Sequence, residues 1–283
     1  MQSNSGGRGR RLLRPGNLAI GLALAVYAIV SVYPFVWMVS GAFKTSRDAI
    51  GSSSLWPRYW TVEGFVSAWG DLHFQIYFIN SLSVTGMTLL LIFVVYPAAG
   101  YAFSVLRFRG RDALYWVFIA LLFVPSIVTL LPTILLQGIL GLLGTHFGLA
   151  LVFSSGTAPL AVLLFRTLFD TIPKELREAA VIDGANEFWI FTRVYAPLAK
   201  PAFATVGILT FVAVWNEYVV SGISLSDENL FTLPIGLGQL SNANIVHWNS
   251  VMAGSLILVV PVIVIYLIGQ KYFNAGVAGA IKG

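Results

Sequence analysis

The sequence predicts an all-α membrane protein with six transmembrane helices. Of its 283 residues, 57% are hydrophobic and only 10% are charged, whereas soluble domains carry roughly 25% charged residues. The chain contains six apolar stretches, each matching the roughly 20 residues that a spanning helix requires. It has no cysteine, which excludes disulfides, thiolate metal sites and cysteine nucleophiles. A chain of this composition needs lipid as its solvent.

The six apolar stretches are separated by polar or glycine-rich segments. The first follows an arginine-rich tail, yet its apolar run exceeds the roughly 7 to 15 residues of a signal-peptide core, so we expect a span. Pro97, Pro125 and Pro132 can bend or break the second and third spans, either to form a gate or merely to shape packing. The predicted spans are Leu18–Phe43, Ile76–Leu106, two within Ala113–Phe165 on either side of Gly138, Gly141, Gly144 and Gly148, then Pro201–Ser221 and Asn249–Gly269.

The distribution of Lys and Arg predicts that both termini are cytoplasmic, because cytoplasmic loops are enriched in these residues. Only Lys44, Arg47 and Arg58 lie in the loops assigned to the outside. Residues 1–17 then form a cytoplasmic tail, and residues 18–283 form a single membrane domain. The cytoplasmic set holds Arg8, Arg10, Arg11, Arg14, Arg107, Arg109, Arg111, Arg166, Lys174, Arg177, Arg193, Lys200, Lys271 and Lys282.

The longest internal loop of the cytoplasmic set, residues 166–200, has the pattern of two short helices. Proline and then acidic residues open the first helix, where the helix dipole favours anions. Gly184 ends this helix, and Asn186 can cap a second one that Pro197 and Pro201 terminate. Small residues let another surface approach the backbone, as docking into a groove requires, although an amphipathic hairpin on the membrane interface is an alternative. These small residues are Ala179, Ala180, Gly184 and Ala185.

The stretch Glu178-Ala179-Ala180-Val181-Ile182-Asp183-Gly184-Ala185, followed by Pro197, resembles the EAA loop of ABC-importer permeases. The likeness to maltose-type carbohydrate permeases extends over nearly the whole chain. It includes Trp215-Asn216-Glu217 and the ending Ala278-Gly279-Ala280-Ile281-Lys282-Gly283. One departure is Ala196-Pro197, where that family usually has Leu-Pro. The resemblance implies a type I ABC-importer permease with a coupling loop at about residues 170–200.

The resemblance also implies that the chain works within a complex and forms half of the pathway for a mono-, di- or oligosaccharide. Its partners would be a second homologous permease, two ATPase subunits and an extracytoplasmic solute-binding protein in a bacterial or archaeal inner membrane. ATP and magnesium would bind the ATPase, so this chain would hold no cofactor and no catalytic residue. Lys282 and Gly283 would contact the ATPase, and Glu178 would pair with a cation in its cleft. The coupling residues implied are Glu178, Ala179, Ala180, Asp183, Gly184, Ala185 and Pro197.

Other function classes have less support from the residues. No G-x-x-x-x-G-K-[ST] sequence occurs, so the chain cannot cradle a nucleotide phosphate by that route. An intramembrane enzyme would need a metal or nucleophile constellation, yet there is no H-E-x-x-H, and His73, His146 and His247 are too scattered to bind a metal together. The net charge of +5 does not indicate nucleic acid, because the cations lie between apolar stretches. Transport of another polar solute, such as glycerol phosphate, stays open within the same family.

Glu217 is the one charged residue inside the predicted spans. An ion-coupled secondary transporter would need ionisable groups within the membrane, and this single carboxylate is thin support for one. It lies towards the external end of the fifth span, where it can extend to the interface or pair with a partner subunit. Alternatively, Asn216 and Glu217 line the sugar path or brace its gate.

Overall fold

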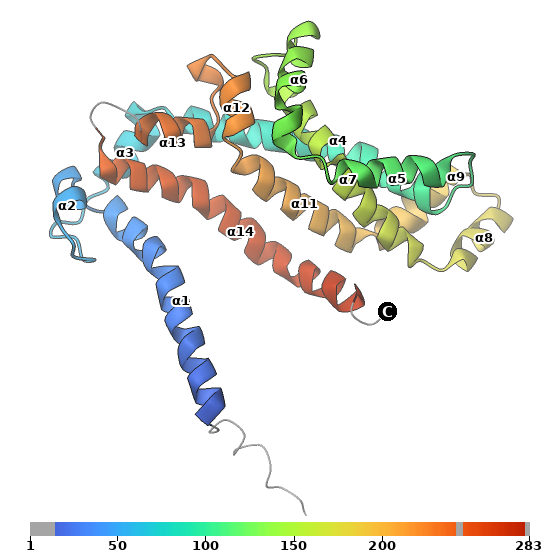
Figure 1. Ribbon diagram of the computed structural model, residues 1–283, viewed down its shortest axis with the longest axis horizontal. Coiled ribbons are helices and arrows are strands. Elements are labelled where there is room, and N and C mark those ends of the chain that lie inside the picture. Colours follow the sequence, from blue (N-terminus) through green and yellow to red (C-terminus); the bar gives the residue numbers. More distant parts are fainter. Residues whose placement is uncertain (1–14, 242–245, 281–283) are drawn as a thin grey trace, which may run out of the picture. The chain divides into compact units, whose positions relative to one another are not determined.

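Every regular element in the described part of the chain is helical, as the sequence predicts. The computed structural model describes residues 15–241 and 246–280, with side chains for 19–241 and 246–270. Two bent helix pairs, together with four unbroken helices, give as many as six spans (Figure 1). The helices long and apolar enough to cross a membrane unbroken are α1 (Pro15–Ala42), α4 (Phe74–Ser104), α7 (His146–Asp170) and α14 (Trp248–Ala280).

Shorter elements connect and extend these helices. They are α2 (Ser46–Gly51), α3 (Glu63–Val66), the π-helix η1 (Ser67–Asp71), α5 (Arg111–Leu121), α6 (Ser126–Ile139), α8 (Lys174–Ile182), α9 (Glu187–Ile190), the π-helix η2 (Phe191–Tyr195), α10 (Ala196–Leu198), α11 (Lys200–Trp215), α12 (Val219–Ser224), the 3-10 helix η3 (Glu228–Leu230) and α13 (Leu233–Ser241).

The third predicted span consists of two helices rather than one. α5 and α6 meet at 102°. Pro125 occupies the N-cap of α6 with extended backbone, at φ −61° and ψ 130°, and its missing N–H cannot continue the hydrogen bonding of α5. The break that the sequence allows at this proline is therefore present. Pro97 and Pro132 instead lie inside α4 and α6.

The fifth predicted span is shorter than expected, and the prediction that Pro197 terminates the preceding helix is wrong, although that helix does end just before Pro201. α11 has 16 residues, or about 24 Å at 1.5 Å per residue. The helical segment from α9 to α10 continues through Pro197 and joins α11 at 73°. Pro201 lies in the first turn of α11, where a missing N–H costs little, and Pro197 closely follows the π turns of η2.

Contacts divide the chain into two compact units. The first comprises Met1–Asp71 and Asn244–Leu256. Within it, no part of the most apolar window of α1 is buried, and the start of α14 packs closely on α3. A Cβ added at Gly64 would lie 2.7 Å from the carbonyl oxygen of Asn249, so only glycine allows this approach. The single-domain prediction for residues 18–283 stays a prediction.

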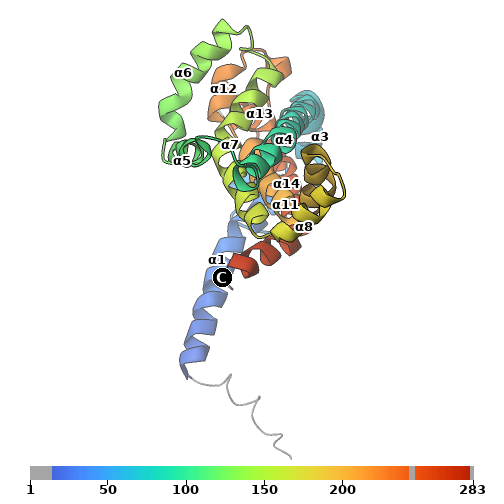
Figure 2. The same cartoon turned by 90° about the vertical axis from the view of Figure 1, so that its right-hand side faces the viewer.

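The second unit, Leu72–Ala243 and Ile257–Gly283, is built around α4, α7 and α11. α4 and α7 run side by side (Figure 1), and α11 packs against both (Figure 2). Gly100 on α4 brings these helices together, since a Cβ there would lie 2.6 Å from the Cβ of Phe165 on α7. Small residues allow such close contact between membrane helices.

Candidate functional site: the coupling segment

Helix α8 of the predicted coupling segment ends where the sequence predicts. The sequence predicts Pro173 in the first turn of this helix, and the structure places it one residue earlier, at the N-cap. Gly184 has φ +80°, in the left-handed region that favours glycine. Its N–H donates to the oxygen of Val181, and the N–H of Ala185 donates to the oxygen of Ala180, both at 3.0 Å. This Schellman pattern satisfies the last carbonyls of the helix and reverses the chain.

Asn186 begins the second short helix, α9, and confirms the predicted N-cap. Its side-chain oxygen accepts a hydrogen bond from the N–H of Trp189 at 2.8 Å. The π-helix η2 follows directly, with wider turns in which each N–H bonds five residues back. Tyr195, at the end of η2, is 2% exposed. The α8 and α9–η2 segments thus form a hairpin, here named the coupling hairpin, residues 174–195.

An ionic clamp formed by Arg177, Glu187 and Tyr101 joins α8 to α9 and both to α4. Nη2 of Arg177 donates to Oε1 of Glu187. The hydroxyl of Tyr101 donates to the other carboxylate oxygen at 2.6 Å. The Arg177 guanidinium, with help from the tyrosine hydroxyl, holds the pKa of Glu187 below its ordinary value, against the opposing effect of desolvation. The carboxylate is therefore ionised at neutral pH.

Aromatic rings beneath the clamp connect the coupling hairpin to three long helices. Tyr101 of α4 lies 5.0 Å from Tyr195 of η2 and 6.1 Å from Phe169 of α7, centroid to centroid. Phe165 of α7 meets Phe203 of α11 at 4.8 Å. Because packed interiors are close to crystalline in density, a displacement of the hairpin is transmitted to these helices. From α8 and α9, Ala180 and Ile190 are buried in the same cluster.

The opposite face of the coupling hairpin is exposed and partly apolar. Ile182 is 85% exposed and Phe188 is 76% exposed. Between α8 and α9 lies a groove of about 540 Å³. An exposed apolar patch rimmed by polar groups is typical of a protein-binding surface. The groove is lined by Leu176, Ala179, Ala180, Asp183, Gly184, Ala185, Asn186, Trp189 and Val194.

Two predicted coupling residues lie outside this groove. Glu178 is exposed and lines a neighbouring basic pocket, and its carboxylate has no hydrogen bond or ion pair within residues 15–241 and 246–280. Its carboxylate is therefore available to a cation on a partner. Pro197 lies further along the chain, in α10. The structure thus brings five of the seven predicted residues into one groove, with Glu178 beside it.

Asn216 and Glu217 lie at the junction of α11 and α12. Asn216 is the C-cap of α11, and its Nδ2 donates to the oxygen of Val212 at 2.8 Å. Oε1 of Glu217 accepts from the N–H of Val220 at 2.7 Å. Its Oε2 accepts from the N–H and the hydroxyl of Ser221, at 2.9 and 2.8 Å. The carboxylate thus supplies acceptors to the first turn of α12, and a place for these residues on the sugar path stays a prediction.

The remaining predicted site residues, Lys282 and Gly283, lie outside the described residues. The histidines, which the sequence indicates are too scattered to bind a metal together, have other places in the structure. His146 binds the carbonyl oxygen of Leu230 at 2.8 Å, while His73 precedes α4 at φ 59°. In the described ranges, no group of three or more His, Cys, Asp or Glu could hold a metal ion.

The ionic clamp is the feature that sequence reasoning missed. From the sequence, Arg177 is used only as one of the Lys and Arg residues that predict which loops are cytoplasmic. Its partner Glu187 lies 10 residues away, across the Gly184 turn, and Tyr101 lies 86 residues from Glu187. Opposite charges flanking a helix-ending glycine are the only local signal that could have suggested the pair.

Comparison with known proteins agrees with this architecture. Residues 95–279 match the family described as "Binding-protein-dependent transport system inner membrane component". The probable ABC transporter permease protein YurM of Bacillus subtilis is 36% identical over 97% of this chain and 91% of its own length. The trehalose/maltose transport system permease protein MalG of Thermococcus litoralis is 31% identical over 94% of this chain and 96% of its own length.

A solved structure has the same fold. It belongs to a bacterial ABC transporter involved in the import of the acidic polysaccharide alginate, and it matches with a TM-score of 0.82 and 25% identity. The match covers 94% of this chain and 98% of the other. The fold and the exposed helical hairpin are those of a membrane permease that is one subunit of a larger transporter. The chain belongs to the family of inner-membrane components of binding-protein-dependent transport systems, the permease subunits of ABC importers.

Proposed function

We propose that this chain forms half of the translocation pathway of an ATP-driven carbohydrate importer and that the coupling hairpin links it to the ATPase. The chain pairs with a second, homologous permease. Two ATPase subunits bind ATP and magnesium on the cytoplasmic side, and an extracytoplasmic solute-binding protein delivers the sugar. Both termini then lie in the cytoplasm of a bacterium or archaeon, where Lys282 and Gly283 reach the ATPase, and this chain itself binds no cofactor.

One observation carries the proposal: the coupling hairpin is exposed on one face and fixed on the other. The exposed groove accepts a partner surface, while the ionic clamp and the aromatic rings hold the hairpin to α4, α7 and α11. Closure of the ATPase dimer on ATP therefore moves these helices as a body. Such coupling requires that the partner bind the inward-facing and outward-facing states with different affinity, and the groove supplies the contact at which that difference arises.

Carbohydrate is the favoured substrate class because relatives along almost the whole chain carry names for sugar transport, among them a trehalose/maltose permease. The alginate importer supports the same class. Another polar solute, such as glycerol phosphate, is the second candidate. An ion-coupled transporter has the least support, since Glu217, the acidic residue in the fifth predicted span, is engaged in capping α12.

Site-directed crosslinking tests the docking part of the proposal. The chain has no native cysteine, so a single introduced thiol reports one position. Ala179→Cys places it in the groove, and Ser155→Cys places it at an exposed position in the middle of α7 as a matched control. We expect a crosslink from position 179, and none from position 155, to the ATPase in the purified complex. Equal labelling at both positions, or none at position 179, would refute docking through the hairpin.

A further inference from the structure

A second pocket of about 1010 Å³ lies where α4 and α7 end, beside the start of α8. Its walls come from the connection between α4 and α5, the last turn of α7 and the first turn of α8. Five cationic side chains line it, against two carboxylates. The cations are Arg107, Arg111, Arg166, Lys174 and Arg177, and the carboxylates are Asp170 and Glu178.

The basic side chains of this pocket are only partly neutralised by the protein. Arg111 pairs with Asp112 at 3.0 Å, and Arg177 pairs with Glu187 in the ionic clamp. Arg107 has no ion pair within the described ranges, and the same holds for the ammonium of Lys174. When Asp112 and Glu187 are counted with the two lining carboxylates, five cations face four carboxylates, so one positive charge remains in excess.

Arg166 and Arg177, which line the pocket, each have one guanidinium nitrogen that is buried. Nη1 of Arg166 and Nε of Arg177 are buried without a hydrogen-bond partner in the described part of the chain. Arg166 is held in place all the same: it stacks over the ring of Tyr115 at 3.6 Å and pairs with Asp170 at 3.6 Å and Asp112 at 4.0 Å. Arg166 is thus a fixed positive charge beside the pocket.

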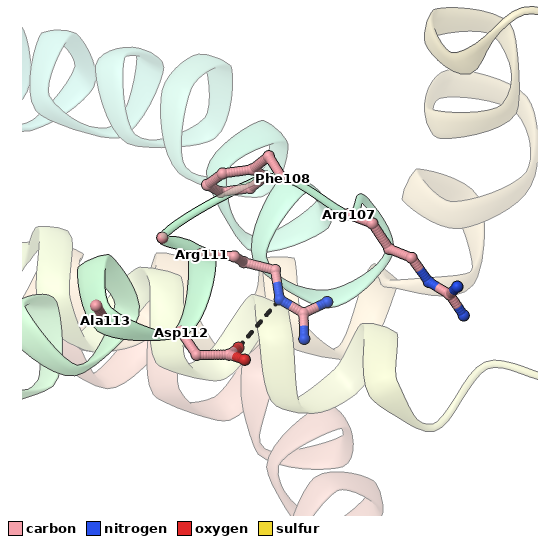
Figure 3. A pocket seen from close by; sticks show the side chains of 6 residues that line it. Arg107, Phe108, Arg111, Asp112 and Ala113 are labelled. Atoms are coloured by element: carbon pink, nitrogen blue, oxygen red, sulfur yellow. Dashed lines mark hydrogen bonds and ion pairs between the residues drawn. The ribbon is translucent and has the colours of Figure 1, made fainter.

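The pocket is located at the boundary of the membrane, because α4 and α7 are spans and end at its rim. The connection from α4 to α5 alternates basic and apolar residues, Leu106-Arg107-Phe108-Arg109-Gly110-Arg111. Phe108 is 43% exposed and extends from the connection in the direction opposite to Arg107 (Figure 3). A basic pocket between membrane helices with an adjacent apolar anchor is the arrangement that binds acidic lipid headgroups.

We propose that this pocket binds the phosphate of an acidic phospholipid of the phosphatidylglycerol type. Guanidinium and ammonium groups bind phosphate through charge-assisted hydrogen bonds. Arg107 and Lys174 are exposed at the rim and hold the headgroup, while Arg166 and Arg177 add positive charge to the wall. The bound lipid bridges the α4–α5 connection and α8, so it steadies the coupling hairpin. The proposal requires only that α4 and α7 cross the membrane, and its failure would leave the docking proposal intact.

Lipid retention by the purified complete complex tests this site. The complex is exposed to equal amounts of phosphatidylglycerol and phosphatidylcholine, washed in detergent, and examined by native mass spectrometry. The test variant is Arg107→Gln with Lys174→Gln, which removes two cations without disturbing an ion pair. Arg109→Gln is the control, since Arg109 is exposed on the same connection but lines neither this pocket nor the groove between α8 and α9. A basic residue near the membrane surface contributes about fivefold in binding, so the double variant should retain phosphatidylglycerol about 25-fold more weakly.

The wild-type complex and Arg109→Gln should keep phosphatidylglycerol in preference to phosphatidylcholine. Undiminished retention in the double variant would overturn the proposal, and so would equal retention of the two lipids. Absence of retained phosphatidylglycerol from the wild-type complex would likewise overturn the proposal. Displacement of the lipid by millimolar inorganic phosphate would identify a free-anion site instead, and this result also counts against the proposal.

Discussion

Replacing Glu187 with Gln removes the anion that the ionic clamp shares between Arg177 and Tyr101. A hydrogen bond to a charged group contributes about 1.5 to 3 kcal/mol. The Arg177–Glu187 pair is partly exposed, with 32% and 43% of the two side chains accessible, so solvent screening reduces its share to about 1 kcal/mol or less. The bond from the buried Tyr101 hydroxyl keeps more of its value. Because Gln still accepts one hydrogen bond, we expect a loss of about 1 to 2 kcal/mol in the free energy that holds the coupling hairpin to α4.

Hydrogen exchange measures this loss directly, because local opening exposes the backbone amides of α8 and α9. A loss of about 1 to 2 kcal/mol corresponds to a roughly 5- to 30-fold faster exchange of these amides. Exchange is followed by mass spectrometry on the purified complex at pH 7, where the lowered pKa keeps Glu187 ionised. Tyr101→Phe should give a smaller increase, since it removes a single bond.

Glu175→Gln is the matched control for this experiment. Glu175 is an exposed carboxylate in the first turn of α8 and has no hydrogen bond or ion pair in the part of the chain that the structure describes. Its replacement costs only a few tenths of a kcal/mol through the helix dipole. Equal exchange in Glu187→Gln and Glu175→Gln, or no change in either, would refute the reasoning that the ionic clamp fixes the hairpin.

Four further substitutions test other parts of the structure. Glu178→Lys should reduce sugar-stimulated ATP hydrolysis and uptake at least tenfold while the chain still inserts; full activity in both assays would contradict the docking role. Gly184→Ala should destabilise the end of α8 by about 1 kcal/mol, because alanine is strained at positive φ, and less ATPase should co-purify. Gly100→Ala should lower the thermal midpoint of the purified complex through a loss of about 1 to 3 kcal/mol from overpacking, whereas Gly86→Ala in the same helix, with nothing within 4 Å of its Cβ, should not. Glu217→Ala should lose about 1 kcal/mol of capping, measured as faster amide exchange in α12, and unchanged uptake and ATPase activity would exclude a role on the sugar path.

The features predicted well are those encoded over a few consecutive residues. Apolar length identifies the segments that cross the membrane, and Gly184 and Asn186 mark helix ends because each acts on its own turn. The third span, predicted as continuous and found bent, shows the limit of this reasoning. Pro125 breaks its span, whereas Pro132 lies inside α6. Whether a proline breaks a helix depends on where the next helix begins, and here α6 begins directly after Pro125.

Contacts between distant segments could not be predicted. A membrane helix is apolar around its whole circumference, so its sequence carries no stripe that says which face meets a neighbour. The pairing of Gly100 with Phe165 and the reach of Tyr101 to Glu187 are therefore invisible in the sequence. Glu217 illustrates the same limit. Its charge within an apolar stretch suggests a functional role, whereas in the structure it caps α12. This capping depends on α11 ending at Trp215, and no local residue predicts that end.

The π-helical turns of η2 make the number of residues between Asn186 and α11 as important as their identity. Such turns hold an extra residue compared with an α-helix, and each α-helical residue corresponds to a rotation of about 100°. Four α-helical residues turn through nearly the same angle as the five of Phe191–Tyr195, so the π turns absorb the extra residue and keep Tyr195 facing Tyr101. A further residue inserted here would turn Tyr195 away by about 100°, so this stretch should tolerate exchange of one aromatic ring for another far better than an insertion.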